Sequence, residues 1–288
     1  MEKAITKKQI DWPVLLFIAA VHVLAIPAFF TFSWENFALL MILNFVTNCI
    51  GVTFGMHRLF SHRTFKLIKP FEWFTGLCAT LSFQGTIGDW VGHHRMHHAG
   101  SDTPEDPHDA NRGFFFSHMG WLFVNEPKFD DPKKLRAFAR DIYRDPVLSV
   151  MSTKWFMIVA QVALMGALFL MGGLEYVVWG IFARLVVCYH SCWFVNSAAH
   201  YWGYTNFDAG DRAKNNWWVA ILAWGEGWHN NHHAYGESVR SGFRFWEIDI
   251  TYMVIRLLKA FGIAYDLKYT MPGQGVEVGA VPAPSAGK

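Results

Sequence analysis

Nine histidines in a recurring arrangement are the residues of this sequence best suited to chemistry. They form three clusters and one isolated position: His57-Arg-Leu-Phe-Ser-His62, His94-Arg-Met-His97-His98, His200, and His229-Asn-Asn-His232-His233. Imidazole is a good ligand for iron, copper, zinc and nickel, so the clusters indicate a metal site without naming the metal. Nine imidazoles are too many for one ion. The sequence therefore predicts two ions that share them, with water or hydroxide in the open positions.

The spacing inside each cluster predicts how the rings meet. Residues three and four positions apart share one face of a helix, so we expect His94, His97 and His98 to converge on one point, and the third cluster to do the same. His57 and His62 are five positions apart, about one and a half turns, and would need a distorted helix to bind together. One such cluster alone would also suit a polar surface or a zinc site. Three clusters favour a shared metal centre.

The remaining polar residues are expected to support the site or the core. Five other histidines have no ligand role in this interpretation. His22, His93 and His190 are expected to be hydrogen-bonded core residues. His108 and His118 are expected to be structural residues beside the metals. Carboxylates must orient so many imidazoles through their second nitrogens. The candidates are Asp89, Asp102, Glu105, Asp106, Asp109 and Glu226. Glu226 is preferred because it lies one turn before His229.

Composition and apolar runs predict an all-α integral membrane protein. The 288 residues are 52% hydrophobic with a formal charge of only +2, so no basic excess points to nucleic acid. Four runs are long enough to cross a bilayer, which takes about 20 helical residues. They are approximately 13–32, 37–56, 153–172 and 175–197. Short connectors at 33–36 and 172–174 join them into two helical hairpins.

Charge placement predicts which side of the membrane carries the histidines. Neither short connector contains Lys or Arg, whereas basic residues gather near the N-terminus and after the second and before the third run. Basic loops stay in the cytoplasm, so both termini and a helical cap with the metal site are expected there. The shorter apolar stretch 71–83 is expected at the interface or buried in protein. Residues 1–271 form one predicted domain, and the Gly/Pro-rich tail 272–288 is expected to be disordered.

The sequence resembles the membrane fatty-acid desaturases of the stearoyl-CoA (delta-9) type. The resemblance rests on HRLFSH, HRMHH and HNNHH, on NSAAH at 196–200, and on the segments 106–121 and 215–233. It implies that the nine histidines bind two irons: His57, His62, His94, His97, His98, His200, His229, His232 and His233. It also implies that Asn196 reaches one iron through water and that Trp90 lies beside the acyl tunnel.

The resemblance further implies the reaction. Such an enzyme uses O2 and two electrons to place a cis double bond near C9 of a saturated acyl chain carried on CoA. The methylene groups of an acyl chain are almost identical, so only their position can determine which pair reacts. The enzyme therefore needs a bent apolar tunnel that holds one pair near the metals. The HNNHH form of the third cluster is closer to family members that act on acyl lipids. A membrane lipid is therefore an alternative to CoA as the acyl carrier. No haem-binding segment follows the third cluster, so a separate donor is expected, such as ferredoxin or cytochrome b5 with its reductase.

Two other functions are compatible with parts of the pattern. A di-iron membrane hydroxylase of alkanes, sterols or carotenoids uses similar histidine clusters, but the spacing and the NSAAH segment favour the desaturase. A histidine-rich metal transporter would gather ionisable residues near the middle of the membrane. Here His22, Arg184 and His190 are scattered there, which argues against transport.

Overall fold

The structure, a computed structural model, describes residues 10–270. The tail predicted to be disordered, 272–288, lies outside the described residues. In chain order the elements are α1 (Trp12–Ala25), η2 (Ile26–Phe30), α2 (Trp34–Asn44), η3 (Phe45–Ser61), β1 (Lys66–Leu67), α3 (Lys69–Leu81), α4 (Ile87–Gly100), η4 (Ala110–Arg112), α5 (Phe114–His118), η5 (Gly120–Phe123), α6 (Pro127–Asp130), α7 (Pro132–Phe138), α8 (Arg140–Arg144), α9 (Pro146–Met151), α10 (Lys154–Val177), η6 (Val178–Ala183), α11 (Arg184–Asn196), α12 (Ala198–Tyr201), α13 (Trp217–Leu222), α14 (His229–Ala234), α15 (Ile250–Ala260) and β2 (Ala264–Tyr265). The protein is mostly helical, as predicted.

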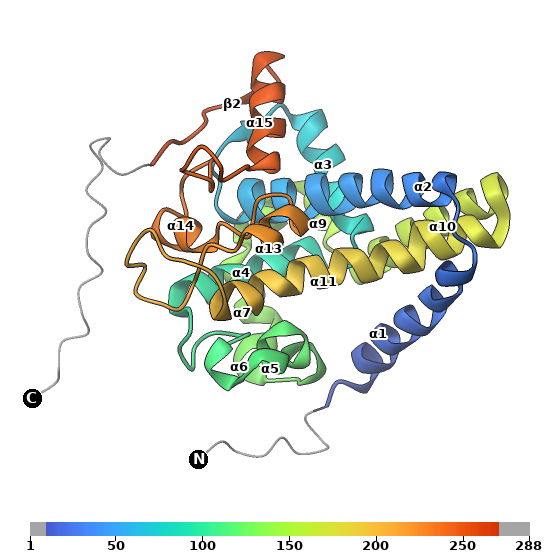
Figure 1. Cartoon of the computed structure of the whole chain (residues 1–288), viewed down its shortest axis with the longest axis horizontal. Coiled ribbons are helices and arrows are strands. Elements are labelled where there is room, and N and C mark those ends of the chain that lie inside the picture. Colours follow the sequence, from blue (N-terminus) through green and yellow to red (C-terminus); the bar gives the residue numbers. More distant parts are fainter. Residues whose placement is uncertain (1–9, 271–288) are drawn as a thin grey trace, which may run out of the picture.

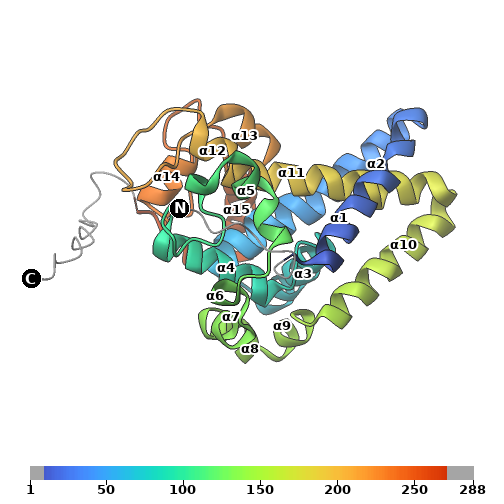
Figure 2. The ribbon, with the colours of Figure 1, turned by 90° about the horizontal axis from the view of Figure 1, so that it is seen from below.

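Within residues 10–270, three helical runs are long and apolar enough to cross a membrane: Trp12–Phe30, Trp34–Ser61 and Lys154–Tyr201. The first two correspond to the first two predicted spans, although the second continues through the first histidine of the first cluster. The third run contains both remaining predicted spans. Its backbone leaves helical geometry at Gly172 and at Gly173, whose φ of 64° suits glycine. Figure 2 shows that the chain turns back here, so that the first part of α10 and α11 extend from the turn at an angle to each other.

The outer surface of these helices is apolar. Phe29 is 85% exposed and Leu170 is 86% exposed, and many other large apolar side chains of α1, α2 and α10 are also exposed. Water-soluble monomers rarely expose apolar patches of this extent. The exposed surface therefore confirms the prediction of a membrane protein.

The second long helix changes its winding where the site begins. Residues 45–61 form the π-helix η3, in which each N–H bonds to the carbonyl five positions earlier. At its end the His62 N–H donates to the His57 carbonyl, 3.1 Å away. In this wider helix, residues five apart become neighbours on one face. The distortion that the spacing of His57 and His62 required is therefore a π-helix.

Helix α3 covers η3 and contains the shorter apolar stretch. A Cβ on Gly51 of η3 would lie 2.5 Å from the Cys78 carbonyl oxygen, so the two backbones are in close contact. Phe71 and Phe74 of α3 are exposed. Nearby, β1 and β2 form a two-stranded antiparallel sheet, so the fold is not purely α-helical. Strand β1 follows η3 in the chain, and β2 follows α15, beside which it is labelled in Figure 1.

We expect Gly51→Ala to destabilise the protein by about 1–3 kcal/mol, because the new methyl group must displace backbone atoms of α3. Gly166→Ala in α10 is the matched control, since a Cβ there meets nothing within 4 Å. It should be neutral or stabilising, because alanine favours helix. Thermal unfolding in detergent measures both changes, and equal behaviour of the two variants would contradict the close packing of η3 and α3.

Candidate metal centre

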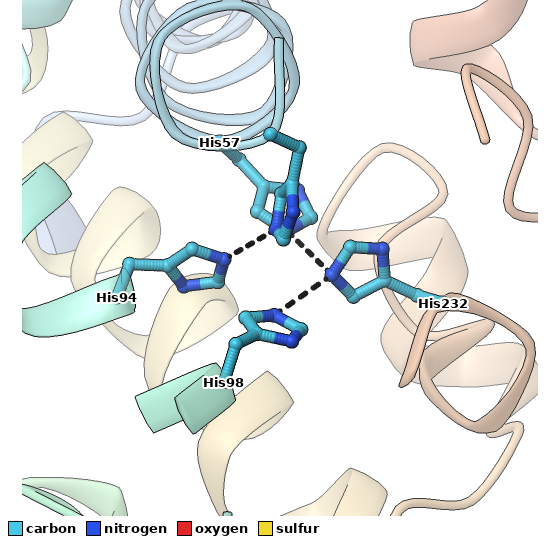
Figure 3. A group of neighbouring side chains, drawn as sticks. His57, His94, His98 and His232 are labelled. Carbon is cyan, nitrogen blue, oxygen red and sulfur yellow. Dashed lines mark hydrogen bonds between the residues drawn. The ribbon is translucent and has the colours of Figure 1, made fainter. Parts of the chain in front are cut away.

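The structure brings all nine histidines of the predicted site together in two groups. In each group, one ring nitrogen per residue lies within 4.8 Å of all the others. The first group is His57, His62, His94, His98 and His232, and the second group is His97, His200, His229 and His233. Figure 3 shows His57, His94, His98 and His232, which reach toward one point from η3, α4 and α14.

The HRMHH cluster is divided between the two groups, so the expectation that its histidines converge on one point is wrong. An α-helix turns by about 100° per residue. His94 and His98, four positions apart, differ by only about 40° and both join the first group. His97 lies about 60° from His94 around the helix axis, in the direction opposite to His98, and it joins the second group.

The HNNHH cluster is divided in the same way with the roles of the groups exchanged. His229 and His233, four positions apart, join the second group, and His232 joins the first. Each HxxHH segment therefore gives a pair to one group and a single residue to the other. Helices α4 and α14 both serve both groups.

The distances between nitrogens indicate ligands rather than hydrogen-bonded pairs. His232 Nε2 lies 3.0 Å from both His57 Nε2 and His98 Nε2. One imidazole nitrogen has a single in-plane bonding direction, so it cannot hydrogen-bond two such partners. Nitrogens bound at right angles to one ion, each about 2.1 Å away, would lie about 3.0 Å apart. His200 and His229 Nε2 in the second group are also 3.0 Å apart. The residues fit a metal ion in each group.

Carboxylates hold four of the rings by their outward nitrogens. Four Nδ1 atoms face an oxygen: His57 faces Glu226 at 2.9 Å, His97 faces Asp106 at 2.9 Å, His200 faces Asp102 at 3.0 Å, and His233 contacts Asp211. A proton on Nδ1 leaves the Nε2 lone pair free to face the centre of its group. The carboxylates thus select the tautomer that metal binding needs.

Three of the six predicted carboxylates have this role. Asp102, Asp106 and Glu226 contact ring nitrogens, as described above. Glu105 instead pairs with Lys128 on the surface, and Asp109 caps the short helix η4. Asp89 lies in the first turn of α4, where an acidic side chain suits the helix dipole.

Glu226 orients a different histidine from the one its sequence position suggested. It contacts His57 and does not lie on the helix of His229, because Trp224 and Gly225 have positive φ and α14 begins only at His229. Its other oxygen accepts from Arg58 Nε at 3.0 Å. Arg58 is 1% exposed and also donates to Asp249 and to the Val239 carbonyl. This buried network connects the first cluster to the C-terminal segment.

Asp211 was missed by sequence reasoning. It lies in the loop before α13, 22 positions before His233, and no spacing distinguishes it from the nearby Asp208. Its contact with His233 arises only when the loop folds over α14. Although burial acts in the opposite direction, the hydrogen bond to His233 lowers the pKa of Asp211 below its usual value. The carboxylate is ionised at neutral pH.

The two other predicted site residues lie beside the groups. The Trp90 ring stacks on His94 with centroids 5.0 Å apart and meets His57 edge-on at 6.4 Å. Asn196 is half-buried at the end of α11, four positions before His200. Within residues 10–270 no hydrogen bond of its side chain is recorded, and its link to a metal through water stays a prediction.

The histidines without a predicted ligand role lie outside the two groups. His108 packs on His97 at 4.2 Å between centroids and lies beside Asp106, and burial lowers its pKa to about 3. His22 Nδ1 donates to the Ile18 carbonyl and its Nε2 faces His190, which in turn faces His118. His22 and His190 are therefore hydrogen-bonded, as predicted, although both are half-buried rather than in the core.

Burial keeps six of the clustered rings neutral. It lowers the pKa well below the usual value for five of them, and the neighbouring imidazoles act in the same direction: His62, His94, His98, His229 and His232. For His233 the pKa falls to about 4. At neutral pH these nitrogens carry free lone pairs, which is the form that binds metal.

We expect Asp211→Asn to weaken metal binding by about 10- to 100-fold, because the loss of an orienting carboxylate has effects of this size. Iron retention during titration with a chelator measures the change. Asp208→Asn is the matched control, because Asp208 lies in the same loop, is exposed and contacts only a backbone N–H of that loop. Equal retention in both variants would show that Asp211 does not support the site.

We expect the metal-free protein to lose stability as the pH falls below 6.5, the ordinary pKa of histidine. The unfolded chain takes up protons there, whereas the folded chain holds these rings neutral, so acid favours unfolding. Thermal unfolding in detergent from about pH 8 to about pH 5 tests this. The double variant His94→Gln/His98→Gln should show a shallower fall, and a flat wild-type profile would contradict the pKa shifts.

Comparison with known proteins identifies the family. The family model for fatty acid desaturase matches residues 32–269. The sn-1 stearoyl-lipid 9-desaturase of Anabaena variabilis is 46% identical over 91% of this chain and 96% of its own length. The sn-2 palmitoyl-lipid 9-desaturase of Nostoc sp. (strain 36) is 40% identical over 94% of both chains. The icosanoyl-CoA 5-desaturase of Limnanthes douglasii is 38% identical over 89% of this chain and 72% of its own. This chain belongs to the fatty acid desaturase family, and it is an oxidoreductase.

Proposed function

We propose that this protein is an O2-dependent desaturase that inserts a cis double bond at C9 of a saturated acyl chain carried on a membrane lipid. The observation that carries the proposal is the convergence of nine histidine nitrogens in two adjacent groups of five and four. Two metal ions held this way, taken here as iron, supply the O2 activation that breaking an unactivated C–H bond requires.

The lipid carrier replaces the CoA carrier that the sequence first suggested. Two relatives named as stearoyl-lipid 9-desaturases are 46% and 45% identical to this chain, and the palmitoyl-lipid enzyme is 40% identical. Relatives named as acyl-CoA desaturases are 38–39% identical and act at C5. The same names favour desaturation over hydroxylation, and membership in an enzyme family leaves the transporter alternative without support.

In this proposal the first group holds one iron and the second group holds the other, with Asn196 completing the second site through water. Glu226, Asp106, Asp102 and Asp211 fix four of the rings so that Nε2 faces the centre. Rigid placement matters because only position can distinguish one methylene pair from the next. Trp90 stacks on a first-group ring and would form a wall of the acyl tunnel at the metals.

We propose four membrane passes with both termini and the histidine-rich end in the cytoplasm. The reversal at Gly172 and Gly173 divides the third long run into two helices, each about 20 residues or more in length. A membrane-embedded enzyme would take its lipid substrate directly from the bilayer, and the electrons would come from a carrier such as ferredoxin or cytochrome b5 with its reductase.

We expect expression in a host without its own desaturase to yield a new cis-Δ9 monounsaturated acid, which vanishes in His97→Ala and His232→Ala together with bound iron. His93→Gln is the matched control, because His93 adjoins the same cluster but faces Asp130 at 3.2 Å, outside both groups. Gas chromatography with mass spectrometry identifies the product, and metal analysis of the purified protein counts the iron. After a short pulse of labelled stearate, the double bond should appear first in the lipid fraction.

Each alternative has a distinct outcome in the same experiment. A hydroxylated fatty acid would assign the hydroxylase reaction, and label that appears first in acyl-CoA would restore the CoA carrier. Desaturation that persists in His232→Ala would contradict the histidine assignment.

A further inference from the structure

The helices α7 and α8 form a basic groove on the surface of the protein. It has a volume of about 380 Å³ and is lined by Lys133, Arg136, Ala137, Arg140, Tyr143 and Arg144. All four cationic side chains are exposed, and the Arg136 guanidinium lies over the Tyr143 ring at 4.4 Å. We call this surface the basic groove.

Four carboxylates near the basic groove are engaged elsewhere, whereas Asp89 lies near the groove residue Tyr143 without an ion pair among the described residues. Asp141 accepts from Arg95 at 2.7 Å, and Asp145 accepts from Lys69 at 3.0 Å. Asp130 faces His93, and Asp131 caps the start of α7. Among the described residues no ion pair of the four groove cations is recorded. The four cations therefore outnumber the nearby free carboxylate, and the groove presents net positive charge to a partner.

The basic groove lies directly behind a helix that carries metal ligands. Helix α7 packs on α4, where a Cβ on Gly92 would lie 2.9 Å from the Leu135 side chain. Arg95, next to His94, donates to the Phe138 carbonyl of α7, to Asp141 of α8 and to the Phe60 carbonyl of η3. Helix α7 and the ligand-bearing helix α4 thus lie between the groove and the first group.

Two anionic partners suit four cations: lipid headgroups and an acidic protein. A helix that lies on a membrane exposes apolar side chains beside its cations. Helix α3 has this character, with Phe71 and Phe74 exposed, and so does α15, with Met253, Leu257 and Phe261 exposed. In contrast, residues 127–149, all of which the structure describes, expose no large hydrophobic side chain. The basic groove is built to face water rather than lipid.

We propose that the basic groove docks an acidic electron-carrier protein that supplies the metal centre. The inference rests on the proposed function, because converting CH2–CH2 and O2 into CH=CH and two waters consumes two electrons and two protons. A one-electron carrier must therefore dock twice per turnover. Complementary charge speeds such short-lived encounters more than it strengthens the complex.

The test is the triple variant Lys133→Glu/Arg140→Glu/Arg144→Glu, which leaves Arg136 on Tyr143. The control is Arg256→Glu/Lys259→Glu, which reverses two exposed cations of α15 where the triple variant reverses three. Both are assayed in nanodiscs with an acidic plant-type ferredoxin, its reductase and NADPH. The triple variant should need about tenfold more ferredoxin for half-maximal turnover at low salt, with kcat at saturating ferredoxin unchanged, and the difference should shrink as salt screens the charges.

Two readouts are independent of turnover. Ferredoxin binding to the immobilised protein should weaken in the triple variant but not in the control, and reduction of the bound iron by dithionite should be the same in both. Unchanged ferredoxin dependence and binding would overturn the proposal. Loss of binding to phosphatidylglycerol vesicles with unchanged ferredoxin dependence would also overturn it and make the groove a headgroup site. If wild type binds ferredoxin at the groove yet forms no cis-monoene, the proposed function fails while the docking surface stands.

Discussion

The convergence of nine imidazoles whose ring nitrogens face two common points is the constraint on which the rest of the structure depends. Lone pairs that face one another are unfavourable unless a cation lies between them, so the polypeptide must hold these rings in place. It does so with four carboxylates on the outer nitrogens and with helices that cannot rotate independently. Burial lowers the pKa of six of the rings: His62, His94, His98, His229, His232 and His233.

The buried charges around Arg58 extend this support to distant parts of the chain. Arg58 follows His57 in η3 and meets Glu226 before α14 and Asp249 before α15. A buried ion network of this kind seldom stabilises a fold strongly, but the loss of one member would leave its partners buried and unpaired. It fixes the relative position of three segments that no local contact would bring together. The same carboxylate, Glu226, then orients a ring of the first group.

The sequence predicted the membership of the site better than its internal arrangement. The i, i+3 and i+4 spacing and the four apolar runs follow from helical periodicity, and the Gly172-Gly173 reversal follows from glycine's conformational freedom, so these could be read directly. The division of each HxxHH segment between the two groups could not be predicted, because it depends on where the two groups lie relative to one helix. The π-helix at His57 was visible only as a mismatch in spacing. Asp211 reaches His233 from a loop, and a loop contact leaves no periodic signal in the sequence.

The exchange of roles between α4 and α14 has a consequence for how the protein matures. Each helix contributes to both groups, so an ion that fills one group also immobilises the two helices that form the other. The first ion to bind would meet the cost of ordering α4 and α14, and the second would find its ligands already arranged. Loading should therefore be cooperative, with few molecules that hold a single ion, and the spacing of the two ions would be fixed by two rigid helices rather than by either site alone.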